Sequence, residues 1–149
     1  MGGAPLATAA LAAAAVAHRK PIDYSILVFG GDVGVAKSQT NEVPVDQIVT
    51  SVLSLRGFGT TNLADALRES ASQLARSTAQ RRITILLSDC RSTSAQAAEE
   101  SAQSLDELVI IAHSDDSDEA RAFSQRVGAR FATVGGPSDI PEALLAVLN

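Results

Sequence analysis

The fold of this chain is decided by an apolar run that ends on a carboxylate, Ile83-Thr84-Ile85-Leu86-Leu87-Ser88-Asp89. A near-continuous apolar run is typical of a strand buried on both faces of a parallel sheet, and we expect the strand to cover residues 82–88. Upstream, Gly59-Thr60-Thr61-Asn62-Leu63 leads from a Gly/Thr loop into a helix predicted over residues 62–77. We therefore expect the hydroxyl of Thr61 and the carboxylate of Asp89 at one edge of the sheet, where they could hold a hard divalent cation.

The rest of the chain alternates between predicted helices and strands. Further strands are expected at residues 23–29, 33–38, 108–112 and 129–134, and further helices at residues 5–19, 44–55, 94–103, 118–127 and 140–148. A turn at residues 30–32 joins the first two strands into a hairpin. This order predicts one α/β domain: a doubly wound, mostly parallel sheet with helices on both faces and one antiparallel edge strand.

Composition excludes several classes of function. The 149 residues carry a net charge of −5, and no basic cluster could neutralise the phosphates of a nucleic acid. The single cysteine, Cys90, rules out an internal disulfide. No apolar run is long enough for a membrane span, and no basic residue precedes the Ala-rich stretch at 4–17, as a secretory signal would require. We expect a cytoplasmic protein.

Taken separately, Asp89 and Thr61 have simpler, purely structural interpretations. Asp89 could cap the loop Cys90-Arg91-Ser92, with Arg91 as its ion partner. Thr61 could act only as a helix N-cap, a role that Asn62 could also fill.

Together with the element order, these segments resemble a von Willebrand factor A-type (VWA) domain over nearly the whole chain. The matching parts are the Gly59–Leu63 loop with its helix, the apolar strand ending in Leu87-Ser88-Asp89, and the hairpin at Phe29-Gly30-Gly31-Asp32. The resemblance implies a metal-ion-dependent adhesion site, in which Thr61 and Asp89 would be ligands of Mg²⁺ or Mn²⁺. A carboxylate of a partner protein would fill the open coordination position.

The sequence departs from that family in one respect. The family's first loop has the pattern D-x-S-x-S, which does not occur here, and Met1-Gly2-Gly3-Ala4 looks like the part that follows it. We therefore expect an N-terminally truncated VWA domain that lacks the central first strand. With so few ligands left, the chain is expected to bind Mg²⁺ or Mn²⁺ weakly or not at all.

The resemblance implies a protein-binding module and not an enzyme. Intracellular bacterial members of the family often work beside MoxR-type or chelatase-type AAA+ ATPases, so such an ATPase is the expected partner. Two alternatives remain open: a small α/β enzyme that uses Asp89 as a strand-end acid, and a fragment without independent function.

Other polar residues have structural interpretations. We expect Cys90 to be a half-buried bystander and Ser88 and Ser92 to make loop hydrogen bonds. The acidic run Asp115-Asp116-Ser117-Asp118 is interpreted as capping and dipole complementation of the next helix.

Overall fold

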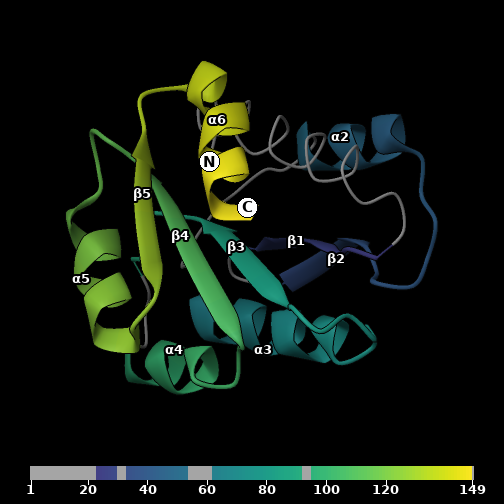
Figure 1. The fold of residues 1–149 in the computed structure, drawn as a ribbon, viewed down its shortest axis with the longest axis horizontal. Coiled ribbons are helices and arrows are strands. Elements are labelled where there is room, and N and C mark those ends of the chain that lie inside the picture. The colour runs from purple at the N-terminus through teal and green to yellow at the C-terminus, as the bar shows by residue number, and fades with distance from the viewer. Residues whose placement is uncertain (1–22, 30–32, 54–61, 92–94, 149) are drawn as a thin grey trace.

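The computed structural model describes residues 23–29, 33–53, 62–91 and 95–148 (Figure 1). The strands are β1 (Ile26–Phe29), β2 (Val33–Lys37), β3 (Ile83–Leu87), β4 (Glu107–His113) and β5 (Arg130–Val134). The helices are α2 (Val45–Leu53), α3 (Leu63–Leu74), α4 (Ala95–Ala102), α5 (Asp118–Val127) and α6 (Ile140–Leu148), with the 3₁₀ turn η1 (Pro137–Asp139) before the last. The predicted helix at residues 5–19 and the turn at 30–32 lie outside the described residues.

The parallel sheet has the order β3-β4-β5. Ile85 pairs with Val109 and Ile111 pairs with Ala132, so all three strands run in register toward the same edge. The middle strand, β4, is apolar on both faces, as a parallel strand covered by helices must be. This arrangement confirms the predicted α/β fold.

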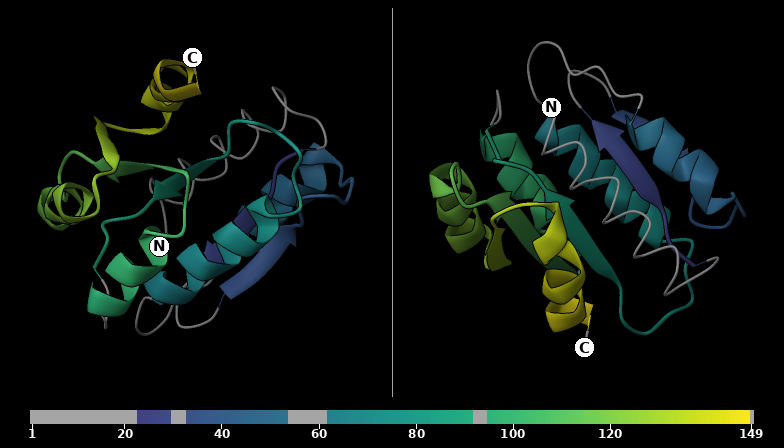
Figure 2. Two further views of the ribbon diagram at one scale, coloured as in Figure 1. Left: turned by 60° about the horizontal axis from the view of Figure 1, so that its bottom comes forward. Right: turned by 90° about the horizontal axis from the view of Figure 1, so that it is seen from above.

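Helices cover both faces of this sheet (Figure 2). On one face, Leu86 and Ile110 form a core with Leu67 of α3, Ala98 of α4 and Phe123 of α5. On the other face, a second core combines side chains of the sheet and α6: Val109, Ile111, Val134, Ile140 and Leu144. Alternate residues of β4 enter opposite cores, which is the two-residue period of a strand.

The hairpin of β1 and β2 is antiparallel, as predicted, and among the described residues it forms a two-stranded sheet of its own. It lies between α2 and α3 in Figure 1, and α3 contacts both of its strands. The pairing shifts register between Ile26 and Leu27. The hairpin is therefore held to the rest of the molecule through helices.

A partly buried polar network joins the hairpin to the end of α3. Gln73 accepts a hydrogen bond at its Oε1 from the backbone N–H of Gln39 at 2.8 Å. Asp23 accepts from Gln39 Nε2 at 2.9 Å and from Ser77 Oγ at 2.8 Å. We call Asp23, Gln39, Gln73 and Ser77 the polar latch. Its members come from segments far apart in sequence, so it fixes their relative positions.

Several elements are shorter than predicted, for local reasons. The first strand starts at Ile26 because the backbone before it serves other bonds: the carbonyl of Tyr24 accepts from the buried Nζ of Lys37 at 2.6 Å. Helix α3 ends at Leu74 because the chain tightens there, and the N–H of Ser77 donates to the carbonyl of Leu74 at 3.0 Å.

Candidate functional site

Asp89 stands two residues beyond the end of β3, at the carboxyl edge of the parallel sheet. Its Oδ1 accepts a hydrogen bond from the backbone N–H of Arg91 at 3.0 Å, which closes a tight turn. The Oδ2 atom takes part in no hydrogen bond among the described residues. One oxygen of a half-buried carboxylate is thus available at the edge where ligands of α/β sheets bind.

The residue after Asp89 is held in an unusual backbone conformation. Cys90 has φ +60°, in the left-handed region that L-residues rarely adopt. Its N–H donates to Ser88 Oγ at 3.0 Å, so that hydroxyl makes the loop bond expected of it. The Cys90 side chain is buried in the core. Burial and the nearby Asp89 charge raise the pKa of the thiol to about 12, which keeps it protonated and unreactive.

Arg91 does not pair with Asp89, contrary to the simpler interpretation of that loop. Its Nη2 lies 2.6 Å from Asp116 Oδ1, in the loop after β4. The two loops are neighbours because β3 and β4 are adjacent parallel strands, whose carboxyl ends meet. The ion pair therefore joins the loops, and no cationic side chain within the described ranges pairs with the Asp89 carboxylate.

Thr61, the other predicted ligand, lies outside the described residues. The helix that follows it is described from its N-cap, Asn62, whose Oδ1 accepts from the N–H of Asp65 at 3.2 Å. Leu63 and Ala64 of the first helical turn belong to the same core as Cys90. The start of α3 and the loop after β3 are thus part of one packed unit.

The acidic run before α5 contributes charge and no side-chain cap. Asp118 and Glu119 occupy the first turn of α5, where their charges complement the helix dipole. The predicted cap is wrong for Ser117: it is the N-cap residue, but its side chain makes no capping hydrogen bond. Among the described residues, no group of three or more His, Cys, Asp or Glu side chains is placed to hold a metal ion.

No model of a protein family matches the sequence, and no curated protein matches it significantly. Among solved structures, it is similar to manganese-loaded TRAP protein from Plasmodium vivax, with a TM-score of 0.69 and 17% sequence identity. That protein contains a VWA domain. The chain has a VWA-like fold.

The similarity extends over 95% of this chain and 63% of the TRAP structure. This chain therefore corresponds to less than two thirds of that protein, and at this identity the likeness concerns the fold alone. None of the described helices is long and apolar enough to cross a membrane.

Sequence reasoning missed two features of the molecule. The pair of Arg91 and Asp116 could have been found, since both follow neighbouring parallel strands. The polar latch had no such signal, because Gln39 and Gln73 are ordinary polar residues in sequence.

Proposed function

We propose that this chain is a non-enzymatic, VWA-type protein-binding module that recognises a partner's carboxylate through a divalent cation, Mg²⁺ or Mn²⁺. Thr61 and Asp89 would supply its own ligands. The observation that carries the proposal is the VWA-like fold with Asp89 at the carboxyl end of β3. A free carboxylate oxygen at that edge is the kind of ligand that Mg²⁺ and Mn²⁺ prefer.

Two further observations support the same site. Leu63, two residues after Thr61, belongs to the core that also contains Cys90, next to Asp89, so both ligands would come from a single packed unit. In addition, the structurally similar TRAP protein was solved in a manganese-loaded form.

The small number of protein ligands also limits the affinity of the proposed site for the cation. Asp89 is the only carboxylate on the described part of the β3 loop, and the sequence contains no D-x-S-x-S pattern. Mg²⁺ requires near-octahedral oxygen coordination, so two protein ligands leave most positions to water or to a partner. We therefore propose that this chain holds the cation weakly until a partner supplies a carboxylate.

Paramagnetic broadening by Mn²⁺ tests the site directly. In the amide NMR spectrum, substoichiometric Mn²⁺ should broaden the signals of Ser88, Cys90 and Arg91 first, and Asp89→Ala should remove this effect. Asp46→Ala, an exposed acid at the start of α2, is the matched control and should change nothing. Broadening centred elsewhere, or unaltered by Asp89→Ala, would refute the metal site.

The proposed partner is a MoxR-type AAA+ ATPase of the same organism, suggested by the family resemblance. Purified ATPase should bind the immobilised chain in Mg²⁺, lose binding in EDTA, and fail to bind Asp89→Ala. Equal binding in Mg²⁺ and EDTA would contradict metal-bridged recognition, and no binding in either would exclude this partner.

A further inference from the structure

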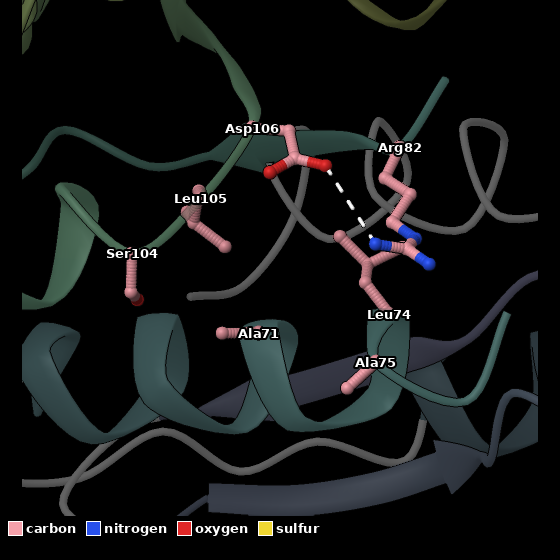
Figure 3. Close-up of a pocket in the computed structure, with 7 residues that line it drawn as sticks. All are labelled: Ala71, Leu74, Ala75, Arg82, Ser104, Leu105 and Asp106. Atoms are coloured by element: carbon pink, nitrogen blue, oxygen red, sulfur yellow. Dashed lines mark ion pairs between the residues drawn. The ribbon is translucent and has the colours of Figure 1, made fainter. Parts of the chain in front are cut away.

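A small cavity lies between the end of α3 and the segments that lead into β3 and β4 (Figure 3). Its volume is about 150 Å³, and it is lined by Ala71, Leu74, Ala75, Arg82, Ser104, Leu105 and Asp106. Arg82 precedes β3 and Asp106 precedes β4, which places the cavity at the amino ends of these strands. It is therefore separate from the edge that carries the proposed metal site.

Arg82 brings one incompletely used hydrogen-bond donor, Nη1, to this cavity. Its Nη2 donates to the carbonyl of Ser77 at 2.8 Å. Its Nη1 lies 3.9 Å from Asp106 Oδ2, an ion pair too long to be a hydrogen bond. Its Nε is buried and has no hydrogen-bond partner among the described residues. A ligand in the cavity cannot reach so fully covered an atom, so Nη1 is the donor that it can use.

The other walls are mainly apolar. Ala71, Leu74 and Ala75 of α3 form one side and Leu105 stands across from them, as Figure 3 shows. The hydroxyl of Ser104 is already used, since it donates to the carbonyl of Ser101 at 2.7 Å. The cavity thus combines a planar cationic group with a short apolar crevice, and its volume is comparable to one that holds benzene.

We propose that this cavity binds a small monocarboxylate with a short apolar tail. The carboxylate would accept a charge-assisted hydrogen bond from Arg82 Nη1, and the tail would lie between Leu74 and Leu105. Asp106 competes for Arg82 at present, but its side chain is 60% exposed and free to turn toward water. A compact inorganic anion would leave the apolar walls uncovered.

Butyrate is a suitable probe, with butyramide as its uncharged counterpart. Titration of the full chain, followed by amide and Arg82 Nε NMR signals, should show saturable shifts with butyrate and none with butyramide. The dissociation constant should be millimolar, because so few atoms yield little binding free energy. Asp106→Asn should tighten binding, since it removes the competing carboxylate.

Two variants test the proposed site, one at its charged group and one at its apolar wall. Arg82→Gln should weaken binding by about tenfold or more, the loss expected for a charge-assisted pair. Ala71→Leu should block the crevice while Arg82 remains, so it tests the site even if Arg82→Gln fails to fold. Arg76→Gln removes an exposed charge near the same end of α3 and should leave binding unchanged.

The proposal is wrong if butyrate causes no saturable shifts, or if it binds Ala71→Leu as well as the wild-type chain. The acid could be a free metabolite or the end of a partner chain, and a short peptide ending in valine separates these sources. Competition between the peptide and butyrate assigns the site to a chain terminus. Binding of butyrate without competition assigns it to a free acid.

Discussion

At the scale of single residues, Cys90 shows how the loop after β3 is strained. Its φ of +60° suits glycine, and the cost for another residue is about 1 kcal/mol or more. We predict that Cys90→Gly is more stable than Cys90→Ala by about 1 kcal/mol, because both remove the thiol and only glycine relieves the backbone. Urea unfolding of the two variants measures this difference.

The matched control is a buried alanine inside a helix. Ala98 of α4 is fully buried, and at such a position glycine is less stable than alanine by about 0.5–1 kcal/mol. The order of Gly and Ala should thus be reversed between positions 90 and 98. The same order at both positions would show that the strain at Cys90 is absent in solution.

The raised pKa of the Cys90 thiol also predicts that the folded chain becomes less stable at alkaline pH. The pKa of its thiol rises from 9.0 to about 12 on folding, so the unfolded chain loses this proton first. The free energy of unfolding should therefore fall by about 1.4 kcal/mol per pH unit between these values.

The measurement compares the wild-type chain with Cys90→Ala in urea unfolding from pH 8 to the alkaline limit. Tyr24 and Lys37 also have shifted pKa values, but both groups are present in each chain, so their effects cancel in the difference. A difference that stays constant with pH would contradict the prediction.

At the scale of elements, sequence patterns located the helices and strands well where local signals exist. The predicted boundaries of α5 and α6 match the structure, because Pro141 and Gly128 mark ends that follow from backbone chemistry alone. The ends of β1 and α3 were misplaced, because there the backbone makes bonds to Lys37 and within a 3₁₀ turn. Such competition is invisible in a periodicity of apolar residues.

Gly128 gives the sharpest test of an element boundary. It closes α5 with φ +70°, and a Cβ added there would meet no atom within 4 Å. Gly128→Ala should therefore cost about 1 kcal/mol through backbone strain alone. Gly136 has equal space and no left-handed φ, so Gly136→Ala should be close to neutral. Equal melting temperatures of the two variants would contradict this account of the α5 terminus.

At the scale of the whole molecule, the sequence predicted the layers of the sheet and the place of Asp89, since both follow from the order of elements. The ion pair of Arg91 with Asp116 follows from the same order, because both residues come after neighbouring parallel strands. The polar latch could not be predicted in this way, because the contact of Gln39 with Gln73 depends on how the hairpin packs on α3.

The separation of the two sheets predicts that the molecule opens in parts. Since no described backbone bond joins the hairpin to the parallel sheet, the hairpin should open without β4. In native-state hydrogen exchange, amides of β1 and β2 should then exchange with lower free energies than those of Ile110 and Ala112.

Gln73→Ala should enlarge this difference in exchange free energy between the hairpin and β4. The substitution leaves the buried N–H of Gln39 without its acceptor, which costs about 1–3 kcal/mol. Gln103→Ala, an exposed glutamine after α4, should leave both sets of amides unchanged. If Gln73→Ala lowers protection equally in the hairpin and in β4, the two sheets unfold as one unit, and the latch adds only to global stability.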